Sequence, residues 1–341
     1  MRIKVALFVV IGLVMVLLSI SLGSAHVPLA DVFHVIGHAV FGLDLPEHIT
    51  AATVSIVWSL RLPRVLLAFL AGSALSVSGA VMQSVLQNPL ASSYTLGVSS
   101  GASLGASLVL FLGVSLPFLA MLTLPILGFV FGLATILLAM AIAKRIDGSM
   151  GNQTIILTGI VFSLFVNAIT TLLFSLFLND SNRMIAWQMG SFAMRDWHTV
   201  WILAPIAVAG IFFITRFHWE LDILSFGEEQ AEAIGVNSRH TKTTLLVSSA
   251  ALTGSTIAFI GVIGFVDLVV PHIVRRLFGP AHRYVIPMSA VIGGALMVLC
   301  DLIARTVLAP RELPVGVVTA MIGAPFFAYI YFSKRGVSNG A

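Results

Sequence analysis

The sequence predicts an all-α membrane protein with about ten transmembrane helices and an internal inverted repeat. The chain has 341 residues, of which 58% are hydrophobic and 9% are charged, whereas a typical soluble domain is about 25% charged. It contains many apolar windows of the ~20 residues that cross a bilayer core. Its single cysteine, Cys300, cannot form an intramolecular disulfide, so we expect it to be a packed apolar side chain. Residues 1–341 are therefore predicted to form one transmembrane domain.

Apolar windows of spanning length place ten helices along the chain. The N-terminal run from Val5 to Leu22 is long enough to span, so we expect a retained first helix and not a signal peptide. The boundary between the seventh and eighth spans is poorly marked, because 243–279 is almost continuously apolar. The predicted spans are 4–24, 65–85, 93–113, 117–143, 153–178, 198–216, 243–262, 265–279, 284–307 and 315–333.

Charge predicts the orientation of these spans. With a cytoplasmic N-terminus, twelve of the 18 Lys and Arg residues fall on cytoplasmic segments, as the positive-inside rule requires. Both termini are then cytoplasmic. A nine-span alternative would move Lys334 and Arg335 outside, which the rule disfavours.

Two connections are too long to be simple turns. The extracytoplasmic segment 25–60 contains DVFHVIGHAVF, whose helical apolar spacing predicts a helix on the membrane surface or over the mouth of the protein. The cytoplasmic segment 217–242 is predicted to contain a short helix around Glu228 and Ala231 that Gly235 ends. A polar helix of this kind suits docking of another protein, although an ordinary solvated loop is the alternative.

Part of the residue pattern of segment 61–97 recurs 182 positions later in the sequence. Seven identities in 28 positions without a gap predict duplication of a membrane unit, a common way to build transporters. Coincidence is the alternative, because Gly, Ser and Leu are frequent in membrane helices. The identical pairs are Leu70/Leu252, Gly72/Gly254, Ser73/Ser255, Gly79/Gly261, Leu86/Leu268, Pro89/Pro271 and Gly97/Gly279.

The sequence also argues against several kinds of chemistry. It has no GxxxxGK[ST] phosphate loop and no HExxH or paired Cys/His metal site. Ionisable residues inside the spans are few, which disfavours a proton-driven transporter. We expect Asp301 to pair with Arg305 one helical turn away. Asp267 is expected near the extracellular turn between the seventh and eighth spans, where it is solvated or tunes docking or substrate entry.

Several motifs resemble the FecCD-type permeases of ABC importers for iron–siderophores, haem and cobalamin, and the resemblance covers nearly the whole chain. They are RLPR at 61–64, LAGSALSVSGAVMQ at 70–83, NPLA at 88–91, LGVSSGA at 96–102, IGFVDLVVPH at 263–272, DLIAR at 301–305 and ELPVGVVTAMIGAPFF at 312–327.

The resemblance implies a transport subunit of a prokaryotic inner membrane and not an enzyme. It implies no cofactor on this chain, with ATP and Mg used by two partner ABC ATPase subunits. A second permease copy, identical or related, and a periplasmic or lipid-anchored binding protein complete the expected assembly. The expected cargo is an iron chelate. Haem, cobalamin or an oxyanion such as molybdate are alternatives, and a secondary transporter or channel is the alternative of another class.

The resemblance also implies roles for individual residues. Arginines of the RLPR and DLIAR motifs are expected to meet acidic residues of the binding protein, although anchoring in lipid headgroups is the alternative. The expected docking residues are Arg61, Arg64 and Arg305, the cytoplasmic gate residues are Asn88, Leu90 and Asn152, and the ATPase-coupling residues are Gly227, Glu228, Ala231 and Gly235.

At two positions the chain departs from the pattern of the family. Ser93 stands where the family usually has proline, and Asp267 stands where it usually has glycine.

Overall fold

A computed structural model describes residues 1–23, 26–117, 119–148, 150–177 and 181–338, and in these residues the chain is helical apart from turns and loops. The helices are α1 (Arg2–Ser21), α2 (Leu29–Phe41), α3 (Ala51–Val54), a π-helix (Ser55–Arg61), α4 (Leu62–Val85), α5 (Val98–Leu112), a 3₁₀ turn (Ala120–Leu122), α6 (Thr123–Ile146), α7 (Asn152–Leu176), α8 (Ser181–Gln188), α9 (Trp197–Thr215), α10 (His218–Leu224), α11 (Glu228–Ala233), α12 (Ser238–Ile260), α13 (Val266–Phe278), α14 (His282–Thr306) and α15 (Val315–Ser338).

Each predicted span corresponds to a helix, but two of these helices are too short to cross a bilayer. Among the described residues, seven helical segments are long and apolar enough to cross, and Val315–Tyr329 of α15 is a shorter apolar helix. In contrast, α5 has 15 residues and α13 has 13, lengths of about 20 Å at 1.5 Å per residue. Both therefore begin or end inside the bundle.

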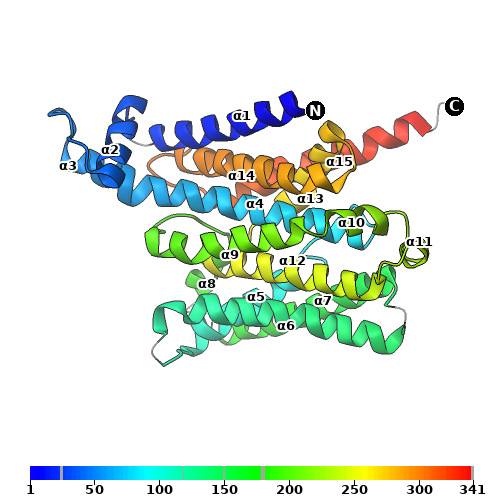
Figure 1. Ribbon diagram of the computed structural model, residues 1–341. Helices are drawn as coiled ribbons and strands as arrows, with labels where there is room; N and C mark the ends of the chain where they lie inside the picture. Colours follow the sequence, from blue (N-terminus) through cyan, green and yellow to red (C-terminus); the bar gives the residue numbers. More distant parts are fainter. Residues whose placement is uncertain (24–25, 118, 149, 178–180, 339–341) are drawn as a thin grey trace.

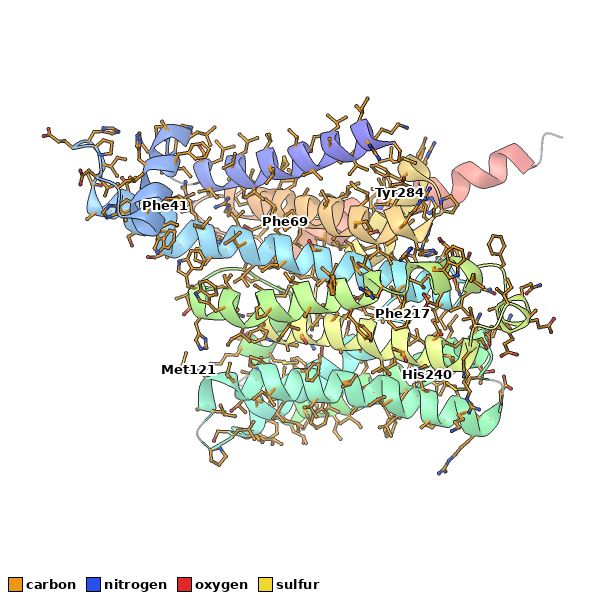
Figure 2. All side chains as sticks on the ribbon, in the orientation of Figure 1. Phe41, Phe69, Met121, Phe217, His240 and Tyr284 are labelled. Atoms are coloured by element: carbon orange, nitrogen blue, oxygen red, sulfur yellow. The ribbon has the colours of Figure 1, made fainter. Side chains whose placement is uncertain are left out.

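The long helices run side by side between two ends of the molecule (Figure 1). One end carries α2 and α3, and Phe41 and Met121 lie there; the other carries α10 and α11, with Phe217, His240 and Tyr284 (Figure 2). We call these the α2 end and the α11 end. The start of α1 and the end of α15 both lie at the α11 end (Figure 1), the arrangement expected from the charge pattern.

Several predicted boundaries were wrong, and two of them bear on the candidate site. The second spanning helix was expected to begin at 65, but continuous helix begins at Ala51 and passes through one π-helical stretch into α4. The third span was expected over 93–113, whereas residues 92–97 form turns and α5 begins at Val98, after Gly97 with φ 86°. The predicted helix within 25–60 is present as α2, whose Val32 and Val35 are fully buried.

The predicted repeat is visible in the order of the helices. A long helix, a short one and two long ones follow one another as α4 to α7, and again as α12 to α15. The colours of Figure 1 show α4 and α12 running in opposite directions, as in an inverted repeat.

The register of the repeat at 182 positions was wrong. Gly79 lies within α4, whereas Gly261 follows the last residue of α12 with φ 81°. Pro89 lies in a turn, whereas Pro271 lies inside α13. The identities therefore do not mark structurally equivalent positions.

The core of the bundle is α4, which contacts α14, α12, α13 and α9. Small residues permit these contacts: a Cβ atom on Gly72 would overlap the Gly293 carbonyl of α14, and one on Gly79 would overlap the Asp267 carbonyl of α13. Close backbone approach through small residues is the usual basis of helix packing in membranes.

Candidate functional site

The predicted docking arginine Arg64 is held by two carboxylates. Its Nε and Nη2 donate to Asp301 at 3.0 and 2.9 Å, and its Nη1 donates to Glu312 at 2.9 Å. Arg305 lies farther away, with its Nε 3.8 Å from Asp301. Asp301 is fully buried, so it needs this fork of donors. The predicted ion pair of Asp301 with Arg305 is therefore present, but the closer partner of Asp301 is Arg64, from a helix 237 residues away in sequence.

The other two predicted docking residues hold the end of α1. Arg61 Nη1 donates to the carbonyls of Ile20 and Ser21, each at 2.9 Å, and Arg305 Nη2 donates to the Ser19 hydroxyl at 2.7 Å and to its carbonyl. Both arginines are less than a tenth exposed. The three arginines thus converge at the α2 end, but each has partners within the chain.

A cavity of about 380 Å³ opens at this arginine cluster. Two further charged residues line it, Arg195 and Glu312, and neither was among the predicted docking residues. Burial lowers the pKa of Arg195, and the Nε atoms of Arg195 and Arg305 are buried with no hydrogen-bond partner among the described residues. Four arginines and one glutamate give the cavity an excess of positive charge, which favours an acidic partner.

The two short helices begin near each other in the middle of the bundle. Gly97, just before α5, lies against Thr135, halfway along α6. Phe265, just before α13, has a positive φ of 68°, a conformation rare for a bulky residue. A cavity of about 1,020 Å³ lies at these two helix starts. Its lining includes Ser92, Tyr94 and Thr95 before α5, Val262, Gly264 and Phe265 before α13, Leu268 of α13, and Gly316, Val317, Ala320, Met321, Ala324 and Pro325 of α15.

The two departures from the family pattern contact each other at these helix starts. Asp267 Oδ2 accepts from the Ser93 hydroxyl at 2.9 Å and from the Ser93 backbone N–H at 3.3 Å. Asp267 is 2% exposed, so the expectation that it is solvated near the outer mouth was wrong. Its backbone lies against Gly79 within α4. The carboxylate therefore joins the turn before α5 to the first turn of α13.

The predicted gate residues lie in two turns. Asn88 Oδ1 accepts the Leu90 backbone N–H at 2.9 Å, an Asx turn that fixes the chain after α4. Leu90 is 45% exposed. Asn152 is the first residue of α7, and its Oδ1 is buried without a hydrogen-bond partner among the described residues. The exposed Leu90 side chain can therefore contact a further partner, whereas the Asn152 side-chain oxygen is buried.

The predicted coupling residues form one compact unit. Glu228 begins α11 and Ala231, fully buried, anchors it. Gly227 and Gly235 flank the helix with φ of 125° and 94°, values that an L-residue with a side chain rarely adopts. The Val236 N–H bonds back to the Ala231 carbonyl at 2.9 Å, which closes the helix as the position of Gly235 predicted.

Helices α10 and α11, which we call the unit of α10 and α11, are bonded directly to the turn after α4 and through Lys242 of α12 to the turn before α7. Gln87, in the turn after α4, donates to the Leu224 carbonyl of α10 at 2.8 Å. Lys242 Nζ donates to Glu228 of α11 at 2.5 Å and to the Met150 carbonyl, just before α7, at 2.9 Å. A displacement of α10 and α11 would therefore act directly on the first turn and through Lys242 on the second.

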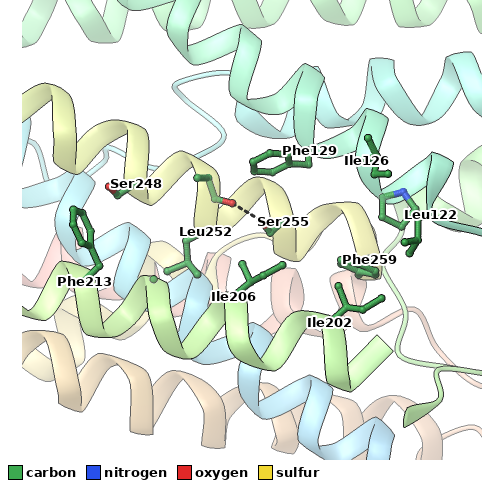
Figure 3. A pocket seen from close by; sticks show the side chains of 13 residues that line it. Leu122, Ile126, Phe129, Ile202, Ile206, Phe213, Ser248, Leu252, Ser255 and Phe259 are labelled. Carbon is green, nitrogen blue, oxygen red and sulfur yellow. Dashed lines mark hydrogen bonds between the residues drawn. The ribbon is translucent and has the colours of Figure 1, made fainter. Parts of the chain in front are cut away.

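A further cavity of about 470 Å³ lies between α6, α9 and α12 (Figure 3). Leucine, isoleucine and phenylalanine dominate its lining. Its Ser255 and Ser248 hydroxyls donate to carbonyls of their own helix at 2.7 Å. A cavity whose hydroxyls are already satisfied suits hydrocarbon and offers nothing to hold a polar chelate.

The short helices α5 and α13 begin at one cavity, and α10 and α11 are hydrogen-bonded to the bundle at the α11 end. Helices interrupted within the membrane at a shared cavity are typical of transporters. The chain belongs to the FecCD transport family, whose model matches residues 10–333. It is accordingly a multi-pass permease subunit of a prokaryotic ABC importer of the iron chelate, haem and cobalamin class, a transport protein and not an enzyme. Permeases of this family typically carry no cofactor of their own.

Relatives and a solved structure agree with this assignment. The chain is 42% identical to an uncharacterized ABC transporter permease of Bacillus subtilis, over 94% of this chain and 91% of that one. It is 38% identical to the Fe(3+) dicitrate permease FecD of Escherichia coli, over 81% and 84% of the two chains. A structure of an inward-facing ABC transporter assigned to the metal-chelate type matches with a TM-score of 0.84 and 26% identity, over 98% of this chain and all of the other.

Proposed function

We propose that this chain translocates an iron chelate by alternating access, driven by ATP hydrolysis in two partner ATPase subunits. The assembly contains a second permease copy, identical or related, and a binding protein that docks at the α2 end. Both termini and the unit of α10 and α11 face the cytoplasm. The observation that carries this proposal is the bonding of α10 and α11 to the turn after α4 and to the start of α7.

In this proposal α11 is the contact with the ATPase. Phe226 and Ile234 flank the helix and are exposed by 78% and 68%, and two large apolar side chains beside a helix suit a partner protein better than water. Movement of α11 would pass through the Glu228–Lys242 pair to the start of α7 and through Leu224 to the turn at Gln87. Gating would then open or close the path near Asn88, Leu90 and Asn152.

The arginine cluster at the α2 end is proposed as the docking site for acidic residues of the binding protein. Because Arg61, Arg64 and Arg305 already have partners, an incoming carboxylate would have to displace one of these partners. Glu312 is the best candidate for displacement, since its side chain is 41% exposed whereas that of Asp301 is fully buried. Arg195 adds a donor that is still unsatisfied.

Iron chelates are favoured as cargo by the relatives. FecD of Escherichia coli is a dicitrate–iron permease, at 38% identity. The hemin permease HmuU of Yersinia pestis, at 35%, and a cobalamin permease of Halobacterium salinarum, at 36%, support the alternatives almost equally.

The test is to purify the binding protein that associates with this permease and to identify its bound ligand by mass spectrometry. Ferric citrate, haemin and cobalamin are then compared as ligands by calorimetry. Tight binding of an iron chelate supports the proposal. Selective binding of haemin or cobalamin would replace the cargo and leave the transporter class intact.

A further inference from the structure

A chain of polar side chains, of which Gln83, Ser84 and His282 are buried, connects α10 with the first turn of α13, across four helices. At its α11 end, Asp222 Oδ1 of α10 accepts from both the backbone N–H and the Nδ1 of His282, at 2.8 and 2.6 Å. Because a carboxylate only accepts, Nδ1 carries the hydrogen. The first residue of α14 is thereby bonded to the unit of α10 and α11.

The chain continues from His282 to α4. Its Nε2 lies 2.6 Å from the Ser84 hydroxyl, and both residues are buried. The single hydrogen of Ser84 can go to His282 or to the Ala80 carbonyl at 2.9 Å, so this contact has two arrangements. Asp222, His282 and Ser84 have the order of a hydrolase triad. Ser84 is nevertheless enclosed and also accepts from Arg275, so it is not placed as a nucleophile.

From Ser84 the chain reaches α13. Arg275 Nη2 donates to the Ser84 hydroxyl at 3.0 Å, and its Nη1 donates to Gln83 Oε1 at 2.5 Å. The Gln83 amide in turn donates to the carbonyls of Asp267 and Leu268, each at 3.3 Å. Leu268 lines the central cavity. An unbroken series of hydrogen bonds thus runs from α10 to the wall of that cavity.

The helix at the far end of this series is suited to move as one body. α13 is only 13 residues long. Two residues with positive φ flank it, Phe265 at 68° and Gly279 at 85°. Short helices bounded by such residues can change angle through a few backbone torsions.

We propose that the side chains of Asp222, His282, Ser84, Arg275 and Gln83 form a relay that transmits movement of α10 and α11 to α13 and so changes the wall of the central cavity. The relay rests on the proposed function, because it takes the ATPase to be the partner of α11. Ser84 is a positioning residue in it. Loss of the Ser84 hydroxyl should uncouple α13 from α10 and α11. The helices should stay in place, because Arg275 keeps its hydrogen bond to the Ala80 carbonyl at 3.1 Å.

The experiment follows the accessibility of Leu268 in the complete transporter. Leu268→Cys is introduced in a Cys300→Ala background, and its rate of reaction with a hydrophilic maleimide is measured without nucleotide and with ATP plus vanadate. We expect nucleotide to change this rate. In Ser84→Ala the ratio of the faster rate to the slower rate should fall by about 5- to 150-fold, the range that corresponds to typical coupling energies. Where the starting ratio is smaller than that, it should fall to 1.

Two matched variants distinguish transmission from general damage. Ser84→Thr keeps the hydroxyl and should restore the response. Ser248→Ala removes a hydroxyl bonded only to its own helix at Thr244 and should leave the response unchanged. An unaltered response in Ser84→Ala, or a Leu268→Cys rate that ignores nucleotide in the parent, would overturn the relay. Failure of any ATPase to co-purify with the parent would instead overturn the proposed function.

Discussion

Ser93 and Asp267 contact each other, although they come from separate turns and lie 174 residues apart. The Asp267 carboxylate accepts both the hydroxyl and the backbone N–H of Ser93. Proline, the residue usual in the family at position 93, has neither donor. Glycine, usual at position 267, has no carboxylate to satisfy. The two departures are therefore one compensated exchange of a proline–glycine pair for a hydrogen-bonded pair.

A double-mutant cycle tests this exchange. Ser93→Pro alone should destabilise the protein, because it removes the two hydrogen bonds that Ser93 donates to a buried carboxylate, at a cost of about 1–3 kcal/mol for each unsatisfied group. The same change in an Asp267→Gly background should cost clearly less. Thermal unfolding of the purified permease in detergent gives the four values. Strict additivity would contradict the compensated pair.

Arg64 and Asp301 provide a second prediction. Arg64→Ala leaves Asp301 buried with only Arg305 at 3.8 Å, and breaking a buried ion pair in this way costs about 3–5 kcal/mol. We expect low yields of folded protein on size-exclusion chromatography. Arg276→Ala, an exposed arginine of α13, is the control and should behave as wild type. Normal stability of Arg64→Ala would show that the pair matters little.

Glu228 and Lys242 predict a defect at the α11 end. Glu228→Ala leaves Lys242, 1% exposed, with only the Met150 carbonyl as a hydrogen-bond partner among the described residues, at a cost of about 1.5–3 kcal/mol for a lost charged hydrogen bond. Thermal stability and co-purification of the ATPase should both fall, whereas Glu229→Ala, at an exposed neighbour, should retain both. Adding Lys242→Met should recover stability but not ATPase binding. Recovery of both would remove Glu228 from the coupling contact.

Asp196 predicts a small acid sensitivity at the α2 end. Partial burial opposes ionisation of this N-terminal cap of α9, but hydrogen bonds from the Thr199 N–H and hydroxyl outweigh burial and lower the pKa of Asp196 below 3.8. Its contribution to stability is therefore complete above the unfolded pKa and is lost as pH falls through the folded pKa. Asp196→Asn should melt with less dependence on pH below 4 than wild type, whereas Asp196→Ala should lose about 1 kcal/mol near neutral pH. Identical acid profiles of wild type and Asp196→Asn would contradict this.

Most of the architecture could be predicted because hydropathy reports directly on membrane spans. The helices α6, α7 and α9 appear as long apolar runs, and Gly227 and Gly235 mark the ends of α11 by their backbone freedom. The half-helices were harder to predict. Hydropathy cannot distinguish a short helix and its buried turn from one continuous span, which is why residues 93–97 were placed in a helix.

The partners of buried polar residues could not be predicted, because they depend on contacts between distant helices. Asp301 was paired with its neighbour Arg305 by helical spacing, yet the fold brings Arg64 closer. Asp267 was placed near solvent, since nothing in the sequence shows that α4 encloses it. His282 was not singled out at all. A lone histidine at a helix start gives no signal until the fold brings Asp222 and Ser84 to it.

The central claim is that ATP in partner subunits drives movement of cargo through this permease. It is tested most directly by uptake into sealed liposomes that contain the permease with its ATPase subunits, with binding protein loaded with radioactive ferric citrate outside and ATP inside. We expect accumulation that requires ATP and the binding protein and that is lost when the Gly227–Gly235 segment is replaced by a flexible linker. Uptake that proceeds equally without ATP and without the ATPase subunits would contradict it and would indicate a secondary transporter or channel.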